Sequence, residues 1–505
     1  MSLLDHIVAH AVSHPERLSL KDQHRALSYG QLLQEVRATA AGLSQRGIVA
    51  GDRVAIQMST SVDAVVCALA CLSVGAIFVP MSTVDPAART RRILDDCAPA
   101  VVVQGTYPPD DARYGGRPVV RPADLRSSAM VEHEPLSGER PAYCIYTSGT
   151  TGVPKGVLVG LASLWHAVED TIAALGIGSC TRALSISSFH FDGSFGLLFP
   201  VPAGGGLLVI NRQEPVLLPR RFINTVLTER INLAFCSPSY LRLLLACPDL
   251  SLLRSSSLKT IGLGGEALSA ATVLAIHDAL PQVCLFNRYG PTETTIAVTS
   301  HRVDPLLVKL HEPVPIGYPH PGVTFHLVDE EGRLFDEVDR GGELYIGGDQ
   351  LMEGYWRDPG LSAKVLRRDL VPGRVLYRTG DLVARRPGGE YVYLGRVDRV
   401  IKRNGVRISL DEIELVLRSQ PGVRHAACVA VEGDDDAVKI VAFVTADSPL
   451  QPSSVSAGLA ALLPRAMLPD ALQQVDAMPL TASGKVDYRL LESHWRARDA
   501  GSARN

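Results

Sequence analysis

Helix and strand signals alternate along the first hundred residues, and this alternation restricts the possible folds more than any other feature. Ser28 and Gln31 form a capping box before apolar residues at helical spacing, and a strand is predicted at 53–58. The alternation continues with a helix from Ala64, a strand at 77–80, a helix at 87–97 and a strand at 100–104. Strands separated by helices pair in parallel, with helices on both faces. The sequence therefore predicts an α/β fold with ligand sites at the carboxyl ends of the strands.

A loop rich in glycine and hydroxyl groups follows the apolar run 142–145. Residues 146–156 read Y-T-S-G-T-T-G-V-P-K-G. Glycines let backbone N–H groups surround phosphate oxygens, while the hydroxyls and the lysine add donors and positive charge. The spacing is not that of a Walker A loop, and an ordinary surface turn is the alternative that this order of residues disfavours. The expected phosphate-binding residues are Thr147, Ser148, Gly149, Thr150, Thr151, Gly152 and Lys155.

This loop resembles the phosphate-binding loop of the adenylate-forming superfamily, which includes acyl-CoA synthetases, luciferases and adenylation domains of nonribosomal peptide synthetases. Matches run from the L-S-Y-G-Q-L string at 27–32 to Lys485, nearly the whole chain. The resemblance implies a large N-terminal domain, residues 1–397, that binds ATP and substrate in parallel sheets flanked by helices. It also implies a small hinged α+β domain, residues 398–505, with Asp398 as the hinge and Lys485 as the catalytic lysine.

The stretch N-R-Y-G-P-T-E-T-T at 287–295 offers further nucleotide contacts. Tyr289 presents a flat face for adenine, Thr292 a hydroxyl for the α-phosphate, and Glu293 a hard oxygen ligand for Mg²⁺. A Gly-Pro turn with a solvated glutamate is the alternative. The resemblance implies that Asp381 accepts hydrogen bonds from both ribose hydroxyls and that Arg396 contacts the nucleotide. The remaining expected nucleotide contacts are Gly264, Glu266, Asn287 and Gly290.

Residues 262–267, G-L-G-G-E-A, fit the relaxed dinucleotide fingerprint G-x-G-x-x-A. That fingerprint also needs an acidic residue at the end of the next strand, where this sequence has Asn287. We therefore set a nicotinamide cofactor aside. The resemblance instead places 264–268 in a turn beside the nucleotide.

The segment S-F-H-F-D-G-S at 188–194 resembles the core segment of amino-acid-activating adenylation domains, in which Asp192 would pair with the substrate ammonium group. A buried structural aspartate is the alternative. Arg288 is unusual in a pocket that is otherwise apolar, so the substrate is expected to carry a second acid group, a phenol-like oxygen or a carbonyl. Arg288 could instead pair with a protein carboxylate. The expected pocket residues are Asp192, Gly193, Gly196, Phe235, Ile261, Leu263, Arg288, Ile296 and Ala297, with Lys485.

The resemblance implies that the enzyme uses ATP and Mg²⁺ to convert an amino acid into its aminoacyl adenylate, with Lys485, Thr292 and Glu293 in catalysis. The constraints set by Asp192 and Arg288 are met by an aryl amino acid of anthranilate or hydroxyanthranilate type and by an acidic amino acid. The chain ends about fourteen residues after Leu491, so a freestanding enzyme that loads a separate phosphopantetheinylated carrier protein is expected. An acyl- or aryl-CoA ligase and a non-catalytic nucleotide-binding scaffold are the alternatives.

Charge and cysteine usage favour a cytoplasmic protein. A net charge of −3 gives no reason to expect nucleic acid or an anionic membrane as a partner, and nine scattered cysteines show no metal-binding spacing. The uncharged run 64–81 is divided by Gly75 and Pro80 into a buried helix and a buried strand. In the C-terminal part, Asn404-Gly405 predicts a hairpin turn, and Ser409 with Glu412 predicts a helix cap.

Overall fold

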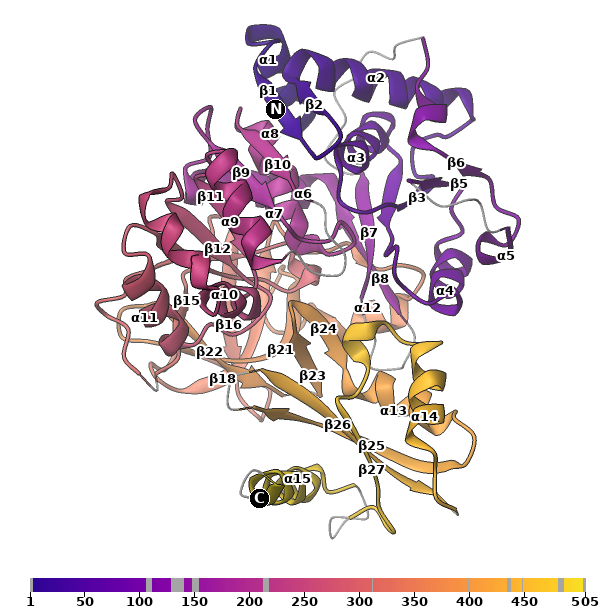
Figure 1. Cartoon of the computed structure of the whole chain (residues 1–505), viewed down its shortest axis with the longest axis vertical. Coiled ribbons are helices and arrows are strands. Elements are labelled where there is room, and N and C mark those ends of the chain that lie inside the picture. The colour runs from indigo at the N-terminus through magenta and orange to yellow at the C-terminus, as the bar shows by residue number, and fades with distance from the viewer. Residues whose placement is uncertain are drawn as a thin grey trace. The chain divides into compact units, whose positions relative to one another are not determined.

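The computed structural model describes residues 3–105, 111–128, 140–147, 154–211, 218–310, 312–397, 399–433, 437–446, 448–479 and 486–502. Contacts divide these residues into two compact units (Figure 1). Counting described residues only, the first unit takes its members from 1–83, 96–146 and 156–397. The second takes its members from 84–95, 147–155 and 398–505.

One sheet of the first unit confirms the predicted alternation of strands and helices. Its seven strands have the order β19-β8-β7-β4-β3-β5-β6, and β3 pairs in parallel with β4 and β5. The Ser28 side chain accepts from the Gln31 amide, and the Gln31 side chain returns a bond to Ser28, so the predicted capping box is present. The bounds are β3 Arg53–Gln57, β4 Ile77–Pro80, β5 Val101–Gln104, β6 Val119–Val120, β7 Pro141–Thr147, β8 Lys155–Gly160, β19 Gly354–Tyr355, α2 Tyr29–Gln45, α3 Val62–Val74 and α4 Ala87–Cys97.

A second sheet of eight strands has the order β14-β13-β12-β11-β9-β10-β1-β2. Strands β13 to β1 pair in parallel along this path, while β14 and β2 pair antiparallel at the edges. The bounds are β1 Leu18–Lys21, β2 Ala26–Ser28, β9 Arg182–Ser185, β10 Leu207–Ile210, β11 Leu233–Cys236, β12 Thr260–Leu263, β13 Cys284–Tyr289, β14 Thr299–Val303, α1 Leu3–Ser13, α6 Leu161–Leu175, α7 Phe195–Leu198, α9 Pro219–Thr228, α10 Pro238–Leu245 and α11 Ala270–Ala279.

A third sheet of the first unit is antiparallel. It has the order β15-β22-β21-β18-β16-β17, and β20 adds to β21. The bounds are β15 Pro315–Gly317, β16 Val323–Val328, β17 Leu334–Phe335, β18 Gly341–Gly348, β20 Leu366–Arg367, β21 Leu376–Arg385 and β22 Tyr391–Arg396.

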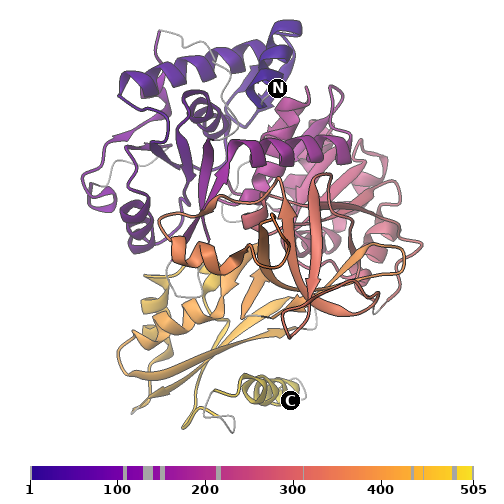
Figure 2. The same cartoon turned by 180° about the vertical axis from the view of Figure 1, so that it is seen from behind.

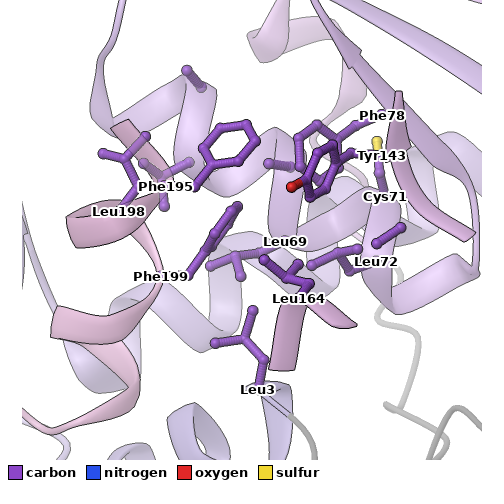
Figure 3. Packing of buried hydrophobic residues seen from close by; sticks show 14 of the residues in the cluster. Leu3, Leu69, Cys71, Leu72, Phe78, Tyr143, Leu164, Phe195, Leu198 and Phe199 are labelled. Atoms are coloured by element: carbon purple, nitrogen blue, oxygen red, sulfur yellow. The ribbon is translucent and has the colours of Figure 1, made fainter. Parts of the chain in front are cut away.

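The largest hydrophobic core joins the first two sheets, because its residues come from strands of both. Phe195 packs in this core near Tyr143, Phe78 and Phe199 (Figure 3). The centroid of its ring lies 5.2 Å from that of Tyr143 and 5.6 Å from that of Phe78. Phe195 is fully buried and directly follows the short helical turn Asp192–Ser194. The aromatic core therefore fixes the segment that carries Asp192.

The second unit is an α+β fold, which confirms the expected class of the C-terminal part. Strands β25 and β26 pair antiparallel, and β27 pairs in parallel with β26. Helices α13 and α14 pack on one face of this sheet and α15 on the other (Figures 1 and 2). The bounds are β23 Val400–Arg403, β24 Val406–Ser409, β25 Val423–Glu432, β26 Val438–Ala446, β27 Ala471–Gln474, α13 Leu410–Arg418, α14 Pro452–Ala460 and α15 Tyr488–Ser502.

Local details of this unit agree with the sequence in one place and differ in another. Asn404 and Gly405 have φ of +52° and +76°, as the predicted hairpin turn requires. The position of the helix cap predicted from Ser409 and Glu412 is correct, but the predicted side-chain hydrogen bonds are absent from this cap. Ser409 precedes α13, but its hydroxyl makes no cap hydrogen bond, and the Glu412 carboxylate instead accepts from Arg89 at 2.8 Å within the same unit.

Arg399 connects four parts of the second unit. Its guanidinium lies 3.7 Å from the centroid of the Tyr488 ring and donates to Asp411, to Glu414 at 2.7 Å and to the Cys428 carbonyl at 2.6 Å. These contacts join the start of the unit to α13, β25 and α15. The residue beside the predicted hinge therefore has a fixed position within this unit.

The uncharged run 64–81 forms α3 and β4, as predicted, and Gly75 ends the helix in the left-handed conformation. Across the described part of the chain, we find no helix with the length and hydrophobicity that a membrane crossing demands.

Close packing at Gly42 gives a prediction about stability. A Cβ added to Gly42 on α2 would lie 1.7 Å from the Leu125 carbonyl oxygen, so Gly42→Ala must move backbone. We expect this variant to lose about 1–3 kcal/mol of stability, which is typical of overpacking, and to unfold at a lower temperature. Ser44→Ala, at an exposed position of the same helix, is the control. Equal thermal midpoints for the two variants would contradict the packing.

Candidate active site

A buried carboxylate joins three of the expected nucleotide-binding residues. The Tyr289 hydroxyl donates to Asp381 Oδ2 at 2.5 Å, and Arg396 donates to the other oxygen, Oδ1, and to the Thr379 carbonyl. Asp381 is 1% exposed, so its charge depends on these donors. Burial, followed by the Asp381 charge, raises the pKa of Tyr289 well above its ordinary value, so the phenol remains a donor. Adenine stacking on the Tyr289 ring stays a prediction.

Glu293 lies in a tight and strained turn. It belongs to the 3-10 turn Thr292–Thr294, is fully buried and accepts from the Tyr355 hydroxyl at 2.8 Å. The next two residues, Thr295 and Ile296, have φ of +58° and +70°, which β-branched residues rarely adopt. Such strain often occurs at functional sites. Glu293 is therefore held as a buried carboxylate and not as the solvated residue of the alternative.

Other expected nucleotide contacts make structural hydrogen bonds. Glu266 accepts from the Ser239 amide and hydroxyl, both at 2.9 Å, at the start of α10. Asn287 is buried and donates to the Pro315 carbonyl at 2.8 Å. Gly290 leaves no room for a side chain, because a Cβ there would lie 2.5 Å from the Ala297 Cα. Gly264 directly follows β12.

Only the two ends of the glycine loop belong to the described residues. Thr147 is the last residue of β7, and Lys155 is the first of β8. Within the described chain, the buried Thr147 hydroxyl has no hydrogen-bond partner, as expected for a group that meets a ligand. The predicted residues Ser148, Gly149, Thr150, Thr151, Gly152, Asp398 and Lys485 lie outside the described residues.

Asp192 and Gly193 lie at the start of the segment fixed by Phe195. Asp192 is half-buried, and its charge contributes, after burial, to the raised pKa of the Tyr143 phenol. Gly193 is exposed, and a Cβ there would meet no atom within 4 Å. The backbone therefore leaves open space next to Asp192.

Arg288, Phe235, Gly196 and Ile296 are brought together as the sequence predicts. The Arg288 guanidinium lies 4.8 Å from the centroid of the Phe235 ring. A Cβ at Gly196 would lie 2.9 Å from both Arg288 Nη1 and the Phe235 ring, and 3.4 Å from Ile296. Ala297 belongs to the same hydrophobic core as Phe235 and Ile296. The glycine at 196 thus makes room for the guanidinium.

The predicted pocket role of Ile261 and Leu263 is wrong, because the prediction is shifted by one residue along β12 and both side chains lie on the other face of the sheet. Both residues pack in the hydrophobic core on the opposite face of the sheet, with Ala234 and Cys236, whereas Phe235 belongs to the core between the sheets. Gly262 pairs with Phe235 across β11 and β12, and a Cβ there would lie 2.4 Å from the Phe235 ring. Side chains alternate along a strand, so Gly262 occupies the face predicted for Ile261 and Leu263.

Three residues that the sequence analysis missed surround Arg288. Arg288 Nη2 donates to the Thr171 hydroxyl at 2.7 Å, and Nε donates to the Ser300 hydroxyl at 3.1 Å. The His320 Nε2 atom lies 3.1 Å from the same Ser300 hydroxyl. Thr171 and His320 are 117 and 32 positions from Arg288, so no short motif could reveal them. Among the described residues no carboxylate pairs with Arg288, so the structure gives no support to that alternative.

No group of three or more histidine, cysteine or acidic side chains that could hold a metal ion occurs among the described residues. The role of Glu293 as an Mg²⁺ ligand stays a prediction; one protein carboxylate would suffice where substrate phosphates supply most of the coordination.

Comparison with known proteins identifies the family of the chain. Residues 7–356 match the AMP-binding enzyme family, and residues 412–485 match the AMP-binding enzyme C-terminal domain. Malpinin synthetase of Mortierella alpina is 33% identical over 94% of the chain, which spans only 6% of that synthetase. Tyrocidine synthase 1 of Brevibacillus parabrevis is 31% identical over 95% of the chain, which spans 44% of that synthase.

Two solved structures are also similar. PA1221, a nonribosomal peptide synthetase protein containing adenylation and PCP domains, has a TM-score of 0.85 and 27% identity, covering 97% of this chain and 84% of that one. The o-succinylbenzoate CoA synthetase of Bacillus subtilis has the same TM-score, and the match covers 97% of this chain and 98% of that synthetase. Its sequence is 20% identical, so this likeness supports the fold alone. The chain therefore belongs to the AMP-binding enzyme family, whose AMP-forming ligases include the adenylation domains of nonribosomal peptide synthetases.

Proposed function

We propose that the chain activates an amino acid as its aminoacyl adenylate. The observation that carries this proposal is the buried cluster of Tyr289, Asp381 and Arg396, which offers a charged and ordered acceptor where the family binds the ribose. Two further observations support the proposal separately: Glu293 is a buried carboxylate, and the Thr147 hydroxyl has no hydrogen-bond partner among the described residues.

The reaction joins two anions, so positive charge and positioning dominate its catalysis. A carboxylate oxygen of the amino acid bonds to the α-phosphorus of ATP as the bond from that phosphorus to pyrophosphate breaks. Lys155 and the glycine loop hold the phosphates, and Lys485 stabilises the charge on the approaching oxygens. Glu293 would serve as the protein ligand of Mg²⁺, which would supply positive charge for the leaving pyrophosphate.

The substrate is proposed to carry an amino group and a second acid group. Asp192 would accept from the ammonium group, and the open space at Gly193 supports this contact. Burial lowers the pKa of Arg288 to about 10, so the guanidinium stays charged at neutral pH. A buried cation without a protein carboxylate favours an anionic partner from the ligand. Acidic amino acids satisfy both constraints. A hydroxyanthranilate-type acid meets them with neutral groups, because its aromatic amino group can donate to Asp192 and its phenol oxygen can accept from Arg288.

The acceptor is proposed to be the phosphopantetheine thiol of a carrier protein. Its thiolate attacks the adenylate carbonyl, and AMP leaves. The presence of a PCP domain beside the adenylation domain of PA1221 supports this choice. A CoA ligase remains the second candidate because the o-succinylbenzoate CoA synthetase shares the fold.

Replacement of the proposed catalytic lysine tests the activity. We expect Lys485→Ala to lower amino-acid-dependent ATP–pyrophosphate exchange about a hundredfold or more, because it removes charge stabilisation at the reacting phosphorus. Lys439→Ala, at an exposed position of β26, is the control and should retain wild-type exchange. Unchanged exchange in Lys485→Ala would argue for a scaffold without this chemistry.

A substrate panel tests the two polar contacts of the pocket. Exchange is measured with glutamate, aspartate, 3-hydroxyanthranilate, their analogues that lack the second acid group, and benzoate. We expect the acidic amino acids to react best, Asp192→Ala to raise their KM about tenfold, and Arg288→Ala to remove the preference for the second acid group. If benzoate exchanges as well as the amino acids, the amino-acid assignment is wrong.

Acceptor choice is measured separately. Wild-type enzyme with its best amino acid is incubated with ATP and either coenzyme A or one of several phosphopantetheinylated carrier proteins. We expect thioester to form on a carrier protein and not on coenzyme A, as followed by mass spectrometry. Thioester formation on coenzyme A at a rate equal to that on every carrier would favour the CoA ligase.

A further inference from the structure

Two hydroxyl groups bind Nε and Nη2 of the Arg288 guanidinium, whereas Nη1 is the nitrogen nearest to Gly196. The Thr171 hydroxyl donates to the Ala167 carbonyl of its own helix at 2.7 Å, so its oxygen lone pairs face Arg288 Nη2, also at 2.7 Å. The Ser300 hydroxyl accepts from Arg288 Nε at 3.1 Å. Thr171 is fully buried on α6, and Ser300 lies on β14. Two nitrogen atoms of the guanidinium are therefore fixed by different elements.

His320 completes this arrangement behind Ser300. Because the Ser300 oxygen accepts from Arg288, its own proton can be donated to His320 Nε2, 3.1 Å away. The other ring nitrogen, Nδ1, lies 3.5 Å from Asp170 Oδ2. Burial, helped by the nearby Arg288 charge, lowers the pKa of His320 to about 4, so the ring is neutral at neutral pH. The neutral ring accepts at Nε2 and carries its proton at Nδ1, toward Asp170.

The third guanidinium nitrogen is left for a ligand. Arg288 Nη1 makes no hydrogen bond to the described residues, and it is the atom that a Cβ at Gly196 would meet at 2.9 Å. Gly196 belongs to the segment that starts at Asp192. The hydroxyl contacts therefore orient Nη1 toward the segment that carries the proposed ammonium contact.

Charge argues against a purely structural role for these contacts. A buried guanidinium is usually compensated by a carboxylate, and an apolar side chain would fill the same space at lower free energy. The Asp170 carboxylate lies 3.5 Å from His320 Nδ1 without a hydrogen bond to it, and His320 and Ser300 stand between this carboxylate and Arg288. The arrangement thus maintains a cation whose charge the surrounding hydroxyls only partly offset.

We propose that Ser300 and His320 are positioning residues that, with Thr171, orient Arg288 so that Nη1 selects a substrate with an acidic second group. The inference rests on the proposed function and deepens it. It assigns substrate selection to residues of α6, β14 and the segment before β16, in addition to the pocket lining itself.

The test compares substrates that carry the second acid group with neutral analogues, in which that group is replaced by an amide or by a hydrogen atom. Exchange kinetics are measured for glutamate and glutamine, aspartate and asparagine, and 3-hydroxyanthranilate and anthranilate. In His320→Ala and Ser300→Ala, we expect KM to rise about tenfold for the preferred acid with a smaller change in kcat, and no change for its neutral analogue. His320→Gln, whose amide oxygen can accept near the Nε2 position, should recover part of the preference.

Matched controls separate positioning from folding. His326→Ala removes a ring that also lies beside a hydroxyl, that of Thr324 at 3.2 Å, and should leave the ratio of acid to neutral kcat/KM unchanged. Thermal midpoints are measured for all variants. If His320→Ala does not fold, the positioning role is judged from Ser300→Ala, which is the smallest change.

The outcomes distinguish failure of the positioning role from failure of the proposed function. If wild-type enzyme prefers the acids and Arg288→Ala removes that preference, but folded His320→Ala and Ser300→Ala keep it, the positioning role is overturned and the proposed function stands. If wild-type enzyme shows no preference for any acid over its neutral analogue, the acidic substrate class is overturned together with the positioning role.

Discussion

The carboxylate of Asp381 is the contact on which the proposed nucleotide site depends, because it joins two sheets of the first unit. Tyr289 comes from the parallel sheet, whereas Asp381 and Arg396 come from the antiparallel one. Tyr289 donates to one oxygen and Arg396 to the other. A carboxylate can accept about four hydrogen bonds, so two positions remain for the ribose hydroxyls. Binding of the nucleotide would therefore add to this cluster without breaking it.

The turn after Glu293 connects the proposed metal ligand to the proposed substrate pocket. Thr295 and Ile296 adopt positive φ at a cost of about 1–3 kcal/mol each, and the fold must offset this strain. The Thr295 hydroxyl donates to the Gln350 carbonyl at 2.7 Å, and Glu293 is held by Tyr355. One strained turn therefore fixes both the Glu293 carboxylate and the Ile296 side chain. The Ile296 side chain would lie 3.4 Å from a Cβ added at Gly196.

Local patterns predict the elements well because each depends on neighbouring residues, as the capping box at Ser28 and the hairpin at Asn404 show. The pocket residues on β12 are predicted on the wrong face, since a shift of one residue reverses every side chain of a strand. Both faces of this sheet are covered and apolar, so the hydrophobic pattern could not reveal the shift. Thr171, Ser300 and His320 are ordinary polar residues in their own segments, and only tertiary packing brings them together around a guanidinium.

Gly196 and Gly262 provide the space that the Phe235 ring and the Arg288 guanidinium occupy. A Cβ at Gly262 would lie 2.4 Å from the Phe235 ring, and one at Gly196 would lie 2.9 Å from both that ring and Arg288 Nη1. Any side chain at either position would displace the ring or the guanidinium that rests on it. Because the guanidinium is already held by Thr171 and Ser300, it cannot move away without losing hydrogen bonds. The absence of side chains at Gly196 and Gly262 therefore makes room for the Phe235 ring and for the buried guanidinium that lies against it.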